Sequence, residues 1–145
     1  MYKFYLVKIL YPSVDVNGYR KKVALQYVAK AVSFTDAEST VVKEVSHFAG
    51  EDMEIKSITI LNIEDIIDGG HYENPEENKW FKCRAEFTEL SDKGKVKKVR
   101  HNYLALACSV SEAEQTVIKY LKSYTQDFTT VTVDETKIVD IFINN

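Results

Sequence analysis

The sequence predicts an α+β fold that arises by tandem duplication of a ββαβ(β) unit, with an antiparallel sheet, two helices on one face of it and a pseudo-twofold relation between the copies. The main observation is an internal match, because residues 4–45 align without a gap on residues 80–121 and 13 of these 42 positions are identical. Strand-like alternation and a helix-capping motif each occur once per copy, which supports the duplication.

The repeats also set the expected domain boundaries. Repeat 1 covers residues 1–67 and repeat 2 covers residues 80–145, and the linker between them, residues 68–79, is rich in turn-forming and acidic residues. A small sheet with one helix buries too little apolar surface to be stable alone. We therefore expect residues 1–145 to form a single compact domain made of two repeats.

Each copy opens with two strands joined by a tight turn. Apolar and polar residues alternate along residues 81–87, and the first copy has Tyr5, Val7, Ile9 and Tyr11 at the positions of the apolar residues. The shared Gly18 and Gly94 permit the positive φ of a hairpin turn. The second strands, 23–32 and 99–108, carry shared alanines on one face, which predicts a helix lying close over that face.

A helix follows the second strand in each copy. Thr35 is followed by Glu38 in the pattern of a capping box, in which the hydroxyl accepts a hydrogen bond from an amide of the first turn. Ser111 and Glu114 repeat this pattern in the second copy. Apolar residues at helical spacing come next, and Gly50 is placed to end the first helix.

A third strand is expected over residues 55–60 and again over residues 128–133. The Ile-rich segments that follow, 63–67 and 138–143, have two interpretations. Each is either the continuation of the third strand after a bend or a short fourth strand.

Composition and charge exclude several classes of protein. A net charge of −3 is too small for the whole molecule to attract nucleic acid or an anionic membrane. No segment approaches the ~18 uninterrupted apolar residues of a membrane span, and the start lacks a signal-peptide cleavage site, so we expect a cytoplasmic protein with no membrane partner. Two cysteines without CxxC spacing fit a reducing compartment.

Enzyme motifs are not found in the sequence, and we expect no catalytic residue, metal or cofactor. Cys83 and Cys108 align with Val7 and Val32, which indicates buried, inert thiols. A metal site at His71 with neighbouring carboxylates is an alternative, but an acidic solvated loop explains the same residues. Those carboxylates are Asp68, Glu73, Glu76 and Glu77.

Four features together resemble a known group of proteins: the aromatic-rich opening strand, the Gly-Lys-x-Lys-Lys hairpin at 94–98, the Ser/Thr-x-Ala-Glu helix starts and the Asp-Ile-Phe ending at 140–142. Over nearly its whole length the chain resembles an uncharacterised family of small duplicated α+β proteins from Bacteroidota and their phages, including crAss-like phages. The resemblance implies a cytoplasmic bacterial or phage accessory protein, and it brings no catalytic residues.

Two surfaces are candidate binding sites. The second face of the opening strand is apolar in the first copy, with Phe4 and Leu6, whereas in the second copy Trp80 is followed by charged residues. We expect these three residues to contact a ligand or partner in a groove between the repeats, because ligand sites favour such interfaces.

The other surface consists of the two basic hairpins. They could contact phosphate groups, although lysine on exposed strands also prevents edge pairing without any ligand. The candidate phosphate contacts are Arg20, Lys21, Lys22, Lys95, Lys97, Lys98 and Arg100.

Three function classes follow from these surfaces. We favour a non-enzymatic phage or mobile-element accessory protein that binds a small anionic molecule or a host protein in the groove between the repeats. The alternatives are a nucleic-acid-binding protein that uses the hairpin tips, and a structural component of a virion or assembly.

Overall fold

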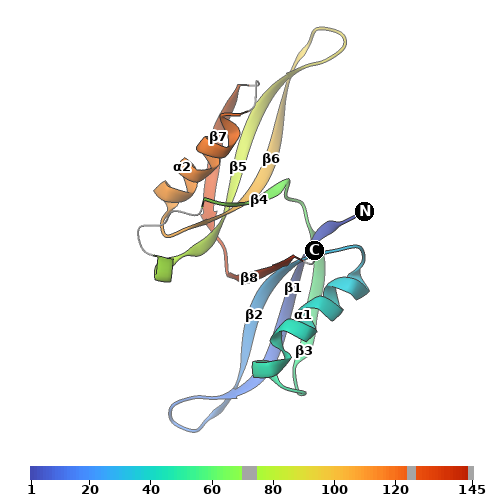
Figure 1. Ribbon diagram of the computed structural model, residues 1–145, viewed down its shortest axis with the longest axis vertical. Coiled ribbons are helices and arrows are strands. Elements are labelled where there is room, and N and C mark those ends of the chain that lie inside the picture. Colours follow the sequence, from blue (N-terminus) through green and yellow to red (C-terminus); the bar gives the residue numbers. More distant parts are fainter. Residues whose placement is uncertain (70–74, 124–126, 144–145) are drawn as a thin grey trace. The chain divides into compact units, whose positions relative to one another are not determined.

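The computed structural model describes residues 1–69, 75–123 and 127–143, and its elements follow the same order twice (Figure 1). The first copy contains β1 (Lys3–Val14), β2 (Arg20–Ala31), α1 (Phe34–Ala49), β3 (Glu54–Leu61) and β4 (Asp65–Asp68). A 3-10 turn, η1 (Pro75–Glu77), precedes β5 (Lys79–Leu90), β6 (Val96–Ala107), α2 (Val110–Leu121), β7 (Phe128–Glu135) and β8 (Ile138–Ile143). The predicted α+β class, built from a repeated unit, is confirmed.

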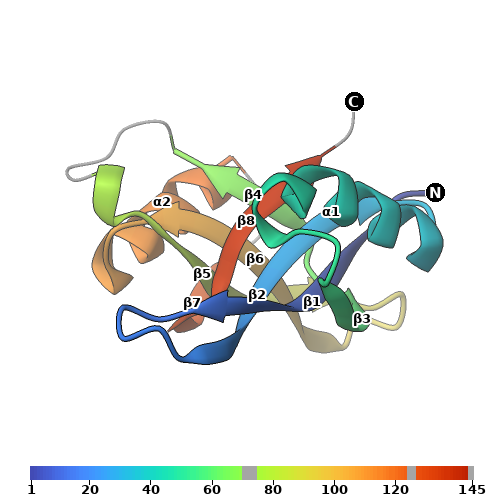
Figure 2. The same cartoon turned by 90° about the horizontal axis from the view of Figure 1, so that it is seen from below.

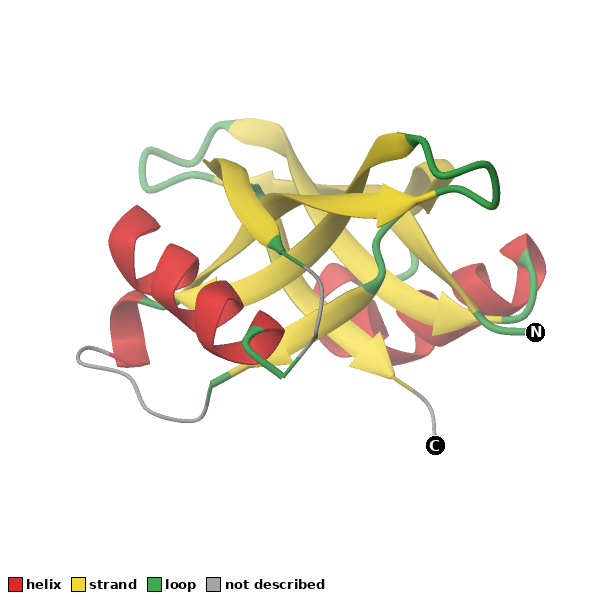
Figure 3. Ribbon diagram, turned by 90° about the horizontal axis from the view of Figure 1, so that it is seen from above, coloured by secondary structure: helices red, strands yellow, loops and turns green. Residues whose placement is uncertain are grey.

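The strands form two four-stranded sheets, in the orders β3-β1-β2-β8 and β4-β6-β5-β7. The sequence predicted one antiparallel sheet with both helices on one face, and this arrangement differs from the structure. Each helix covers three antiparallel strands of its own sheet, β3-β1-β2 or β6-β5-β7, so two separate cores form (Figure 3). Among the residues that the structure describes, only the fourth strands pair in parallel.

The fourth strand of each repeat pairs with the second strand of the other repeat. β8 runs parallel to β2, with Phe142 opposite Ala29, and β4 runs parallel to β6, with Ile67 opposite Ala105 (Figure 2). The two Ile-rich segments are therefore separate strands, exchanged between the repeats. The compact units are residues 1–61 with 137–145 (unit 1) and residues 62–136 (unit 2).

The core of each unit lies between its helix and the facing side of its sheet. In unit 1, Ala29 and Ala31 of β2 are fully buried against Val41 of α1. Ala105 and Ala107 of β6 have the same position in unit 2. The predicted close approach of a helix to this alanine face is confirmed.

The helix starts lie two residues earlier than predicted. Ser33, in an extended conformation directly after β2, is the N-cap of α1, and its hydroxyl accepts from the amide of Asp36 at 3.1 Å. The Asp36 carboxylate in turn accepts from the amide of Val32, the residue before the cap, at 3.0 Å, so the two side chains form reciprocal hydrogen bonds at the helix start. The prediction of Thr35 as the cap is wrong because this residue is already inside the first turn. Gly50 ends the helix with a φ of 78°, as predicted.

The second helix repeats this arrangement. Ser109 caps α2 and accepts from the amide of Glu112 at 3.1 Å, while the Glu112 carboxylate accepts from the amide of Cys108 at 3.2 Å. The prediction of Ser111 as the cap is wrong for the same reason.

Candidate functional site

The apolar residues singled out in the sequence lie on the faces of the sheets that are opposite the helices. Phe4 and Leu6 are half-buried on β1 in unit 1, and Trp80 is half-buried on β5 in unit 2. The amine of Lys30 lies 5.9 Å from the centre of the Phe4 ring. A joint contact of these three residues with one ligand stays a prediction.

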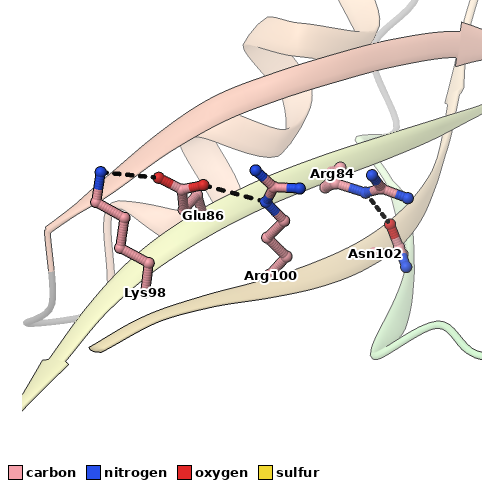
Figure 4. A network of polar contacts seen from close by, with 5 residues as sticks. All are labelled: Arg84, Glu86, Lys98, Arg100 and Asn102. Atoms are coloured by element: carbon pink, nitrogen blue, oxygen red, sulfur yellow. Dashed lines mark hydrogen bonds and ion pairs between the residues drawn. The ribbon is translucent and has the colours of Figure 1, made fainter.

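Part of the basic hairpin charge is balanced by acids of other strands in the same sheet. Lys22 lies 3.5 Å from Glu54, while Lys98 and Arg100 lie 3.7 Å and 3.1 Å from one carboxylate, that of Glu86 (Figure 4). The remaining four predicted phosphate contacts are exposed and form no ion pair within the described residues. Those four are Arg20, Lys21, Lys95 and Lys97. Phosphate binding by the hairpins stays a prediction.

A hollow of about 300 Å³ in unit 1 brings together three lysines from separate parts of the chain. We call it the lysine hollow. It is formed by Lys8, Lys56 and Lys137 together with Ile9, Leu10, Ala24, Leu25 and Gln26.

Sheet pairing explains why these lysines converge. Lys8 lies on β1 opposite Gln26 of β2. A bulge in the pairing of β1 with β3 leaves Lys56 as the extra residue, and a bulge redirects a side chain. Lys137 directly precedes β8, whose first residue is opposite Gln26. The site therefore depends on the strand that unit 1 receives from the second repeat.

The lysine hollow is electrostatically unbalanced. No acidic residue is among its lining residues. Within the part of the chain that the structure describes, Lys8, Lys56 and Lys137 form no ion pair. Several ammonium groups around one concave site, without a carboxylate, create a positive potential that attracts anions.

The matching place in unit 2 is occupied by a network of polar contacts. Arg84 aligns with Lys8, and its Nε donates to Oδ1 of Asn102 at 3.2 Å (Figure 4). The Asn102 amide donates in turn to the carbonyl of Asn62, the residue that aligns with Lys137, at 3.4 Å. The polar groups here bind one another, whereas those of the lysine hollow leave their charge available to a ligand.

Two larger cavities are less suited to an anion. One, of about 700 Å³ beside α1, is lined by Glu38 and Glu51 and by no basic residue. The other, of about 530 Å³ between β4 and α2, has two acidic residues and one lysine. Its lining residues are Ile67, Asp68, Gly69, Glu112, Gln115, Thr116, Lys119 and Tyr120.

The shared aspartates of the fourth strands make structural contacts. One Asp65 oxygen accepts from the amide of Ile66 at 2.8 Å, and the other accepts from the hydroxyl of Tyr120 at 2.8 Å. Asp140 accepts from the amide of Ile141 in the same way. Asp65 thus fixes the start of the exchanged strand β4 to helix α2.

The two thiols have different surroundings. Cys83 is fully buried, and its burial, followed by the charges of Glu114 and Asp134, raises the pKa of the thiol to about 12. Cys108 is half-buried, and its thiol donates to the Glu112 carboxylate at 3.1 Å.

Among the described residues, no cluster of three or more His, Cys, Asp or Glu side chains could hold a metal ion. His71 and Glu73, which the sequence suggested as alternative ligands, lie outside the described residues. Among residues 1–69, 75–123 and 127–143, neither helix is long and apolar enough to cross a membrane.

Comparison with known proteins gives a family without an assigned activity. No curated protein matches the chain. A family model described as a domain of unknown function, DUF4494, matches residues 3–144, which is nearly the whole chain. The protein with the lysine hollow therefore belongs to the DUF4494 family.

Proposed function

We propose that the protein is a non-enzymatic binding protein that holds a small anionic molecule in the lysine hollow of unit 1. The observation that supports this proposal is the convergence of Lys8, Lys56 and Lys137 on one hollow that has no acidic lining residue. The matching place in unit 2 strengthens it, because there the side chains of Arg84 and Asn102 bind each other, and Asn102 also binds the carbonyl of Asn62.

The hollow favours a compact ligand that carries more than one negative charge. Its volume of about 300 Å³ is at the lower end of small-molecule sites. Three ammonium groups match a di- or trianion, such as a phosphorylated or polycarboxylate metabolite. Leu10 provides an apolar side chain, and the Gln26 amide offers a hydrogen bond beside the lysines.

A larger ligand would extend along β1. Leu6 and Phe4 continue the face that carries Lys8, because alternate residues of a strand lie on one side of its sheet. A host protein surface is the second kind of partner that we propose for this face, and it would cover these side chains together with the lysines.

Titration calorimetry with inorganic phosphate, citrate and adenosine monophosphate tests the small-molecule proposal. We expect at least one of these probes to bind. The substitutions Lys8→Gln, Lys56→Gln and Lys137→Gln should each lower the affinity for that probe roughly tenfold, because each removes one charged hydrogen bond. Lys21→Gln is the matched control, because it removes an exposed lysine of the same unit outside the hollow.

Two outcomes would contradict the proposal. One is that none of the three probes binds. The other is binding that weakens as much in the Lys21→Gln control as in the variants of the hollow, because nonspecific attraction to a positive surface would explain such a result.

We also propose a biological context, that of a cytoplasmic accessory protein of a phage or mobile element in Bacteroidota. The support is the resemblance carried by the opening strand, the Gly-Lys-x-Lys-Lys hairpin and the Asp-Ile-Phe ending. Genome neighbourhoods test it, since we expect phage or mobile-element genes beside the coding sequence. A consistent position among metabolic genes of the bacterial chromosome would contradict it.

A further inference from the structure

Both hairpin tips expose aliphatic side chains. At the β1–β2 tip, Val14 and Val16 are 62% and 102% exposed, and Tyr19 beside them is 71% exposed. At the β5–β6 tip, Leu90 and Val96 are 75% and 66% exposed and lie opposite each other in the strand pairing. The same kind of apolar tip therefore occurs in both repeats, although the residues differ.

The turns hold these side chains in place. In the first turn the Asp15 carboxylate accepts from the amides of Asn17 and Tyr19, both at 2.9 Å. In the second, the Ser91 hydroxyl accepts from the amide of Lys95 at 3.0 Å. In each unit the hairpin reaches beyond the helix (Figure 1), so the tip can meet a flat surface before the helix does.

Basic residues outnumber acidic ones at each apolar tip, where the acids are Asp15 at the first tip and Glu89 and Asp92 at the second. Arg20 and Lys21 follow the first turn, and Lys93, Lys95 and Lys97 lie in and after the second. A long lysine side chain can keep its amine at a charged surface while its stem lies along apolar groups. An apolar tip flanked by lysine and arginine side chains matches the interface of an anionic bilayer, where hydrocarbon lies beneath negatively charged headgroups.

We propose that the hairpin tips bind the surface of an anionic lipid bilayer, with the aliphatic side chains at the level of the headgroups and the lysines on the lipid phosphates. This contact is local to the tips and needs no membrane-spanning segment, and it departs from the sequence-based expectation of no membrane partner. It is independent of the lysine hollow. Nucleic acid is the rival partner, because the same cations could bind its phosphates. The tips favour lipid, since aliphatic groups gain from hydrocarbon and the β5–β6 tip has no aromatic side chain to stack on a base.

Co-sedimentation with vesicles tests this inference on the full chain. We expect binding to vesicles with about a third phosphatidylglycerol and little binding to pure phosphatidylcholine, because each basic residue near an anionic surface adds roughly fivefold to partitioning. The double variants Val14→Ser with Val16→Ser, and Leu90→Ser with Val96→Ser, should each weaken binding, and the variant that combines all four substitutions should weaken it roughly tenfold or more. Val131→Ser, at an exposed site on β7, is the matched control and should bind normally.

A parallel titration with duplex DNA and single-stranded RNA distinguishes the rival. Binding to nucleic acid that is lost in a Lys97→Glu, Lys98→Glu, Arg100→Glu variant, with no vesicle binding, would overturn the lipid proposal. Vesicle binding that the serine variants leave unchanged, or no binding to any of these partners, would also overturn it. The lysine hollow variants should bind vesicles like the unaltered protein, so failure of one proposal is separable from failure of the other.

Discussion

At the scale of single residues, Cys83 shows how the repeat predicts the surroundings of a side chain. It is fully buried in the core of unit 2, as Val7 is in the core of unit 1. Burial removes the thiol from water and so disfavours its charged form, which is the main reason that its pKa rises from 9.0 to about 12. The alignment of a cysteine with a valine predicted this environment correctly.

This pKa makes the stability of the protein depend on pH. The pKa is higher in the folded state, so the stabilising effect of the neutral thiol is fully present below pH 9.0 and is lost as pH rises toward 12. The free energy of unfolding should therefore fall more between pH 9.0 and 12 in the unaltered protein than in Cys83→Val. Urea denaturation on both sides of pH 9.0 measures the difference, and identical pH dependence in the two proteins would contradict it.

At the scale of elements, the helix starts show where sequence patterns leave two registers open. Ser33 and Thr35 both precede an acidic residue by three positions, so both fit a capping box. The structure selects Ser33 because the chain leaves β2 in an extended conformation at this residue and turns helical at the next. The presence of each helix could be predicted from the sequence, whereas its first residue depended on where the strand ends.

Alanine substitutions of the caps test this register. Ser33→Ala and Ser109→Ala should each lower the free energy of unfolding by about 1 kcal/mol, because an amide of the first turn loses its acceptor. Thr35→Ala and Ser111→Ala, at the positions that the sequence pattern predicts as caps, should each change the free energy of unfolding by less than about 0.5 kcal/mol. Equal losses at both pairs of positions in urea denaturation would show that the caps are placed wrongly.

At the scale of the whole molecule, short connections explain why the fourth strands are exchanged. If β4 took the place of β8 in unit 1, the chain would have to cross three strand spacings, about 14 Å, and run back about 13 Å to the level of Gln26. Residues 62–64 reach only about 14 Å when fully extended. The two residues between β7 and β8 are shorter still, so neither repeat can complete its own sheet.

Truncation tests this dependence. A chain that ends at Thr136 lacks β8, so Tyr27 loses the stacked ring of Phe142, at 5.3 Å, and β2 becomes an open edge. The free energy of unfolding of unit 1 should fall by more than the roughly 3 kcal/mol that the truncation of one buried Phe side chain costs. Unit 2 keeps all four of its strands and the single tryptophan of the chain, Trp80.

The readouts for the truncated chain are circular dichroism and tryptophan fluorescence during urea unfolding. Circular dichroism should show an early transition of unit 1, while the fluorescence midpoint of Trp80 stays near that of the full chain. In the full chain, Phe142→Ala should also move the circular dichroism transition of unit 1 to a lower urea concentration than the fluorescence midpoint of Trp80. The difference between the two should be smaller than in the truncated chain. A single coincident transition in the truncated chain would contradict the division into these units.

The lysine hollow marks the limit of what the sequence could predict. The repeat, both hairpins and the helix-facing alanines follow from local patterns and their recurrence. Lys8, Lys56 and Lys137 are far apart in sequence and fit no motif, and their meeting depends on a bulge in β3 and on a strand from the other repeat. Local periodicity carries no information about either.

The exchanged strands also constrain how such a gene can evolve. A gene with one copy would encode a three-stranded sheet with an unpaired edge and a last strand with no strand to pair with. Two such chains would complete each other's sheets as a dimer. Joining the two copies in one reading frame keeps this mutual completion while each half mutates separately. The two halves already differ in this way, because one has Lys8 where the other has Arg84 bound to Asn102. A surface can therefore change in one copy while the other copy keeps its internal contacts.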